Sequence, residues 1–109
     1  MVIKADLSGK KALVTGASSG IGKSVAILLA QCGATVAVNH LSGDQRGPEV
    51  VEMLNGEGGQ SIAAPGDVSD PESADAMVFN AIDKLGGLDI LVNNAGTAAT
   101  VEPIPFEDL

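Results

Sequence analysis

The sequence contains no tryptophan, no tyrosine and only two phenylalanines among its 109 residues. A core without large aromatic side chains must be built from alanine and aliphatic residues at close backbone distances, which favours helices lying on a parallel sheet. Basic residues are also scarce, because six stand against fourteen acidic ones and the formal net charge is −8. This balance argues against nucleic acid or an anionic membrane surface as a partner.

Cysteine and histidine occur once each, as Cys32 and His40. A single cysteine cannot form an internal disulfide, and neither residue stands in a metal-ligand spacing, so no metal site is expected. No apolar run approaches the ~18 residues that span a bilayer, and the first residues lack the continuous apolar stretch of a signal peptide. These absences predict a cytoplasmic protein.

What the sequence does contain is an alternation of short apolar runs and amphipathic segments, over a length that suits one domain, residues 1–109. The predicted strands are 11–15, 34–40, one around 61–64 and a fourth centred on 90–92, and the predicted helices are 21–33, 48–55 and 71–85. This β-α-β-α-β-α-β order predicts an α/β fold, a Rossmann-like three-layer half with a parallel sheet. The usual strand order of such a sheet is 3-2-1-4.

The same patterns predict helix ends and buried faces. Asp70 is a suitable N-cap for the third helix, with Pro71 at its first position, and Pro48 is placed at the start of the second helix. One apolar stripe of the first helix is predicted to face the sheet, and it consists of Ile21, Val25, Leu28, Leu29 and Cys32.

A turn with three glycines joins the first predicted strand to the first predicted helix. Such a turn carries unpaired N–H groups and the positive end of a helix dipole, which together form an anion site. Gly16 permits the tight turn, Gly20 the close approach of backbone to a pyrophosphate, and Gly22 the close packing of helix on strand. The hydroxyls of Ser18 and Ser19 can donate to phosphate oxygens. The turn therefore predicts a phosphate-binding site.

Two other interpretations of this turn remain. Residues 16–20 also satisfy G-x-S-x-G, with Ser18 as a nucleophile, but an α/β-hydrolase needs an acidic residue and then a histidine after the serine. His40 is the only histidine, and no acidic residue lies between it and Ser18, so this interpretation is disfavoured. The turn can also be a plain connection without a ligand.

Three motifs resemble those of the short-chain dehydrogenase/reductase family. Residues 15–22, TGASSGIG, are similar to its T-G-x-x-x-G-x-G signature, residues 93–96, NNAG, to its N-N-A-G motif, and residues 66–68, GDV, to its turn after the third strand. The motifs occur in the same order as in the family and extend over nearly the whole chain. The resemblance implies a nicotinamide-dinucleotide-binding fold.

The resemblance also implies roles for individual residues. Ile21 would lie near the nicotinamide and the pyrophosphate, and Asp67 and Val68 would flank the adenine. Asn93, Asn94, Ala95 and Gly96 of the N-N-A-G motif would steady the fourth strand and line the dinucleotide cleft. The alternative for the two asparagines is a strand-end amide that satisfies backbone groups. An ordinary turn aspartate is the alternative for Asp67.

The choice between NAD and NADP is expected ~20 residues after the glycines, where an acidic residue favours the ribose 2′-OH and a basic one the 2′-phosphate. That place holds His40, and the residues beside it, Asn39, Leu41 and Ser42, include no acidic one. His40 and Ser42 are predicted to donate to a 2′-phosphate that Arg46 can reach, so NADP(H) is favoured over NAD(H). The alternative for His40 is a solvated residue at a strand end.

In the family, the catalytic serine and the Tyr-x-x-x-Lys pair lie beyond the N-N-A-G motif. This chain has no tyrosine, so no catalytic residue is assigned and the isolated chain is predicted to be inactive. A separate fragment carrying the tyrosine would be needed for hydride transfer. The fourth strand, residues 88–92, would form an apolar sheet edge, which predicts a homo-oligomer through this edge or through bared helix faces. The alternative function is a non-catalytic self-associating or interaction module without a ligand.

Overall fold

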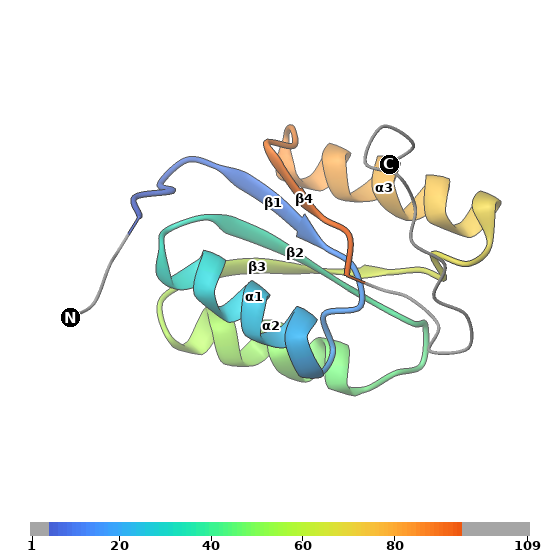
Figure 1. Ribbon diagram of the computed structural model, residues 1–109, viewed down its shortest axis with the longest axis horizontal. Coiled ribbons are helices and arrows are strands. Elements are labelled where there is room, and N and C mark those ends of the chain that lie inside the picture. Colours follow the sequence, from blue (N-terminus) through green and yellow to red (C-terminus); the bar gives the residue numbers. More distant parts are fainter. Residues whose placement is uncertain (1–4, 95–109) are drawn as a thin grey trace, which may run out of the picture.

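A computed structural model describes residues 5–94 of the chain. Its sheet lies between two helix layers, with α1 and α2 on one face and α3 on the other (Figure 1). The elements are β1 (Lys11–Val14), α1 (Gly20–Gln31), β2 (Thr35–His40), α2 (Arg46–Gly56), β3 (Gln60–Pro65), α3 (Pro71–Leu85) and β4 (Ile90–Val92). The predicted alternation of strands and helices is confirmed.

The four strands are parallel and lie in the order β3-β2-β1-β4, as predicted. Ala12 of β1 lies opposite Val36 of β2 and Ile90 of β4. All strands therefore end at the same edge of the sheet. The turn from β1 to α1, the loop from β2 to α2 and the loop from β3 to α3 meet at this carboxyl edge, which is where doubly wound folds bind ligands.

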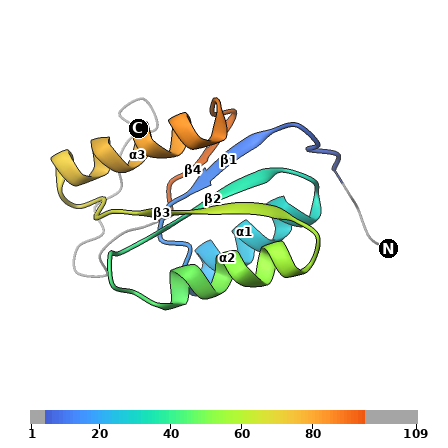
Figure 2. The same cartoon turned by 180° about the vertical axis from the view of Figure 1, so that it is seen from behind.

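The sheet is buried on both faces, because successive side chains of each strand point to opposite sides. Val14 and Val38 face α1 and α2, whereas Leu13 and Ala37 face α3. Figure 2 shows α3 alone on its side of the sheet. The fully buried side chains of α3 in this core are Met77, Ala81 and Leu85. Such cores hold the carboxyl ends of the strands in a fixed arrangement.

The predicted buried stripe of α1 is partly wrong. Ile21 is 75% exposed and Leu28 is 57% exposed, and the buried residues of α1 are Gly22 and Ala26. The helix lies so close to the sheet that its line of contact accepts only small residues. Larger side chains such as Val25 pack beside this line and are half-buried.

Helix ends also differ in detail from the prediction. Helix α2 begins at Arg46, before Pro48, because the Arg46 N–H donates to the Asp44 carboxylate at 3.1 Å and proline is tolerated throughout a first turn. Asp70 does precede α3, but its side chain makes no capping hydrogen bond. The Asp67 N–H donates instead to the Ser73 hydroxyl, at 2.8 Å, and this bond fastens the preceding loop to the helix.

Candidate functional site

The turn between β1 and α1, called here the glycine turn (residues 15–22), depends on its glycines for two different reasons. Gly16 and Gly20 have φ angles of +59° and +60°, which other residues rarely adopt. A Cβ on Gly20 would meet no atom within 4 Å, so the backbone there faces open space. A Cβ on Gly22 would overlap the Gly16 carbonyl oxygen and lie 2.5 Å from Asn94 Nδ2. Gly22 thus occupies the point of close packing predicted from the motif.

The amino end of α1 presents free backbone donors behind this turn. The first paired N–H is that of Lys23, which donates to the Ser19 carbonyl at 3.3 Å. Within residues 5–94, the N–H groups of Gly20, Ile21 and Gly22 have no protein acceptor. Free donors at the positive end of a helix dipole form an anion-binding site.

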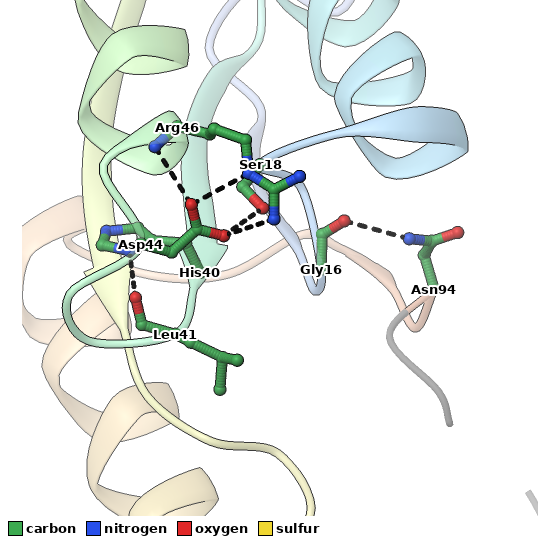
Figure 3. A network of polar contacts seen from close by, with 7 residues as sticks. All are labelled: Gly16, Ser18, His40, Leu41, Asp44, Arg46 and Asn94. Carbon is green, nitrogen blue, oxygen red and sulfur yellow. Dashed lines mark hydrogen bonds and ion pairs between the residues drawn. The ribbon is translucent and has the colours of Figure 1, made fainter. Parts of the chain in front are cut away.

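Two asparagines hold the glycine turn from opposite sides. Asn39, in β2, accepts the Gly16 N–H with its Oδ1 at 3.0 Å. Asn94, just after β4, donates its Nδ2 to the Gly16 carbonyl at 3.2 Å, a bond drawn in Figure 3, and its N–H to Thr15 Oγ1 at 2.9 Å. Asn94 thus has a structural role at the turn. The sequence analysis assigned Asn39 no role, although a polar amide near the end of an apolar strand could have indicated one.

Asp44 is a further residue that sequence reasoning missed. Its carboxylate accepts a hydrogen bond from Ser18 Oγ at 2.9 Å and two from the Arg46 side chain, at 3.0 and 2.9 Å (Figure 3). The bonds from Arg46, followed by the one from Ser18, hold the pKa of Asp44 far below its usual range. The carboxylate therefore stays ionised at neutral pH. Asp44 follows the glycines at close to the ~20 residues where a residue that contacts the ribose is expected, and this spacing could have identified it.

The hydroxyls of the two serines in the turn differ in whether they are free to bind a ligand. The Ser18 hydroxyl donates its hydrogen bond to the Asp44 carboxylate, so this hydroxyl is engaged within the protein. Ser19 is exposed at the amino end of α1, and its side chain makes no capping bond. Of the two hydroxyls predicted to donate to phosphate, Ser19 is the one that remains free to do so among residues 5–94.

His40 is buried, so the alternative of a solvated strand-end residue is wrong. The residue is only 6% exposed, and its ring packs against the backbone of Gly47 in α2. Nδ1 lies 2.8 Å from the Leu41 carbonyl, which can only accept, so Nδ1 carries the proton. In the described part of the chain Nε2 has no partner. Ser42, the other residue predicted to bind a 2′-phosphate, is exposed.

A cavity of about 450 Å³ opens beside the glycine turn, between the amino ends of α1 and α2. Its polar lining combines two cationic side chains, two hydroxyls and one carboxylate. These residues are Ser18, Ser19, Lys23, Arg46 and Glu49. Two positive charges at the amino ends of two helices suit an anionic ligand.

The loop after β3, called here the GDV loop (residues 66–68), lies at the same edge of the sheet. Hydrogen bonds from the Ser69 hydroxyl and N–H to Asp67 lower the pKa of that carboxyl. Asp67 is exposed, and Val68 is half-buried against the core on the α3 side. The predicted site residues Ala95 and Gly96 lie outside the described residues.

Two kinds of site are not found in this part of the protein. No three His, Cys, Asp or Glu side chains of the described residues gather where they could hold a metal ion. Among residues 5–94, no helix has the length and apolar character needed to cross a membrane.

Known proteins resemble this chain in both sequence and structure. YhxD, an uncharacterized oxidoreductase of Bacillus subtilis strain 168, is 45% identical over 104 residues, which are 94% of this chain and 34% of YhxD. A 7α-hydroxysteroid dehydrogenase solved with NADH and 7-oxo glycochenodeoxycholic acid matches with a TM-score of 0.81 and 42% identity, over 94% of this chain and 38% of that one. The landomycin C-6 ketoreductase LanV, solved with NADP and rabelomycin, matches with a TM-score of 0.75 and 37% identity, over 88% and 42%.

The chain thus spans between about a third and two-fifths of the length of these relatives. A family model described as short chain dehydrogenase matches residues 10–109, which is nearly the whole chain. The parallel sheet in the order 3-2-1-4 and the glycine turn at its carboxyl edge agree with this match. The chain belongs to the short-chain dehydrogenase family.

Proposed function

We propose that residues 1–109 form a single dinucleotide-binding domain, the NAD(P)-binding portion of a short-chain dehydrogenase/reductase-type oxidoreductase. The observation that carries this proposal is the amino end of α1, where three N–H groups lack a protein acceptor within residues 5–94. They lie behind a glycine whose missing Cβ leaves the backbone open to a ligand. A pyrophosphate fits this arrangement in charge and in hydrogen bonding.

The residues around the carboxyl edge fit the rest of a dinucleotide. When bound, the nicotinamide group would donate a hydride to a carbonyl or accept one from an alcohol. The chain's own residues bind and orient it, and we assign none of them a catalytic role. The proposed binding residues are Gly16, Ser18, Ser19, Gly20, Ile21, Gly22, His40, Ser42, Asp67, Val68, Asn94, Ala95 and Gly96, to which the geometry adds Lys23 and Arg46.

We favour NADP(H) over NAD(H) because the Asp44 carboxylate already accepts hydrogen bonds from Ser18 and Arg46 and is therefore not free to bind a ribose 2′-OH. Arg46 and Lys23 both line the cavity there, and the Arg46 side chain is 61% exposed. Asp44 accepts two bonds from the guanidinium and so fixes its position. A 2′-phosphate can then bind the N–H groups of Arg46 that Asp44 leaves free. The relatives include one solved with NADP and one solved with NADH.

The cofactor preference can be tested with Arg46→Ala in a calorimetric titration. We expect the wild-type chain to bind NADPH saturably. The variant should bind NADPH about 10- to 100-fold more weakly, because it loses charged hydrogen bonds worth about 1.5–3 kcal/mol, while its affinity for NADH stays nearly the same. Lys84→Ala, which removes a positive charge at the end of α3, is the matched control. An equal loss for both cofactors would contradict the 2′-phosphate role, and no binding by the wild type would contradict the function itself.

We propose that hydride transfer requires residues from outside this sequence. A proton donor is needed for the carbonyl oxygen, and the family's tyrosine is absent from all 109 residues. The isolated chain is therefore expected to be inactive, and activity is expected only with a second polypeptide that carries the tyrosine. The alternative is a non-catalytic self-associating module that has kept the fold without its ligand.

Self-association is favoured by exposed apolar side chains on β4 and on α3. Leu91 of β4 is 58% exposed, and Phe79 of α3 is 71% exposed. The outer edge of β4 pairs with no strand among residues 5–94. An apolar edge strand in this state is a pairing site for another chain. We infer that two copies of the 109-residue chain associate through β4.

The oligomer is expected to dissociate when Leu91 is replaced by lysine, because an edge charge opposes pairing of two strands. Analytical ultracentrifugation across the micromolar range should give a dimer for the wild type and a monomer for Leu91→Lys. Leu28→Lys changes an equally exposed leucine on α1 and is the control. A wild type that sediments as a monomer, or a control that dissociates in place of Leu91→Lys, would contradict pairing through β4.

A further inference from the structure

One buried amide joins two parts of the candidate site. Asn39 is 2% exposed, and its side chain makes three hydrogen bonds. Oδ1 accepts from Gly16 N–H at 3.0 Å, and Nδ2 donates to the Ala64 carbonyl at 2.8 Å and to the Gly66 carbonyl at 3.2 Å. The amide therefore connects the glycine turn to the start of the GDV loop across the end of β2.

On the side of the glycine turn, Asn39 determines where the backbone donors point. Gly16 N–H goes to its side chain, and Ala17 N–H goes to its backbone carbonyl at 2.8 Å. The first two donors after Thr15 are thus directed into the protein. The chain then reverses, and the later donors at the amino end of α1 are left for a ligand. Gly16 keeps its left-handed φ of +59° in this arrangement.

On the side of the GDV loop, Asn39 continues the pairing of β2 with β3. The last backbone bond between these segments runs from Gly66 N–H to the His40 carbonyl at 2.9 Å. Gly66 is buried, and the Asn39 amide supplies its carbonyl with a donor. Without that donor, two carbonyls at the root of the loop would lose their side-chain partner, at a cost in free energy.

We propose that Asn39 is a positioning residue of the dinucleotide site. It fixes the position of the glycine turn relative to the GDV loop, so that both segments bind the adenosine phosphate part of the same ligand. This inference rests on the proposed function. Only a carboxamide offers an acceptor to the turn and two donors to the loop on one short planar group. An aspartate keeps the acceptor and loses both donors, and a serine has too few groups and too little length for all three bonds.

The test measures affinity and local opening in the same proteins. Wild-type chain, Asn39→Asp and Asn39→Ser are titrated with NADPH and with adenosine 2′,5′-bisphosphate, which lacks the nicotinamide. Amide hydrogen exchange at Gly16 and Gly66 is followed by NMR. We expect both ligands to bind the two variants about tenfold more weakly or worse. Exchange should accelerate at Gly66 in both variants, and also at Gly16 in Asn39→Ser, which lacks the acceptor for the Gly16 N–H.

Ser61→Ala is the matched control. Ser61 is 9% exposed and donates to the Val51 carbonyl at 3.2 Å, but it lies at the start of β3, away from the carboxyl edge. It removes buried polar bonds without touching the site, so it should lower stability and leave affinity unchanged. A merely structural role of Asn39 predicts the same behaviour for its own variants. Affinities within twofold of wild type, or an equal loss in Ser61→Ala, would overturn the inference.

Two further outcomes are informative. If both Asn39 variants fail to fold, the wild type still decides, because adenosine 2′,5′-bisphosphate should then shift the NMR signals of the Asn39 side-chain amide and of Gly16 and Gly66 together. A shift at one glycine alone would overturn the inference. If the wild type binds neither ligand, the proposed function fails. The exchange rates at Gly16 and Gly66 in the variants then test separately whether Asn39 holds the turn and the loop together.

Discussion

Replacing Gly22 with alanine is expected to lower dinucleotide affinity about a hundredfold or more, and to lower the free energy of unfolding by about 3 kcal/mol. The new Cβ would overlap the Gly16 carbonyl oxygen, which is backbone and cannot swing aside, and would press on Asn94 Nδ2. Overpacking of this kind typically costs about 1–3 kcal/mol, occasionally more. The amino end of α1 must then move away from the turn, and charged hydrogen bonds to a pyrophosphate are lost.

Urea denaturation and calorimetric titration with NADPH measure the two effects separately. Gly56→Ala is the matched control, since a Cβ at this position of α2 would meet no atom within 4 Å. Alanine is favoured over glycine in a helix by about 1 kcal/mol, so this variant should keep its affinity and be at least as stable as the wild type. Full NADPH affinity in Gly22→Ala would show that the packing of α1 on the turn has no part in binding.

Replacing Gly47 with alanine is expected to lower the free energy of unfolding by about 3 kcal/mol as well, for a different reason. The Cβ would overlap the ring atoms Cγ and Cδ2 of His40 and lie 2.6 Å from its Cβ. The ring is buried, so it has little room to turn away, and overpacking of a filled site costs about 1–3 kcal/mol or more. The amino end of α2, which carries Arg46, would have to lift from the sheet.

A second variant distinguishes this clash from a general effect on α2. His40→Ala removes the ring, so the double variant His40→Ala/Gly47→Ala should be more stable than the sum of the two single changes predicts, by about 2 kcal/mol. Additive losses would contradict the contact.

The same proteins test the predicted binding role of His40. If His40 contributes only packing, the ratio of NADPH to NADH affinity in His40→Ala stays that of the wild type, and if it binds the 2′-phosphate the ratio falls.

Strand order and direction were predictable because they depend on features that are local in sequence. Each strand is a short apolar run, each connection contains a helix, and right-handed crossovers leave few topologies for such a chain. The glycine turn was predictable for the same reason, since backbone freedom at Gly16 and Gly20 is a property of glycine itself. The motif around these glycines then indicated the family.

The buried face of α1 was not predictable from apolar spacing. Apolar periodicity identifies a helix, but it assumes that large side chains mark the contact line. Here the helix approaches the sheet so closely that Gly22 and Ala26 mark it, and Ile21 and Leu28 are exposed. The distance at which a helix packs on a sheet depends on the side chains of both elements, so the apolar pattern of the helix alone does not predict its buried face.

The order of the elements, the parallel sheet and the glycine turn could be predicted from the residues alone, because they follow from local propensity and from the handedness of β-α-β connections. The side chains that meet at that turn could be identified only in the folded protein. Asn39, Asp44 and Asn94 reach it from 23, 26 and 78 residues away, and His40 points under α2 because Gly47 leaves space for its ring. Contacts across such separations depend on how strands align in three dimensions, and linear spacing does not encode that alignment.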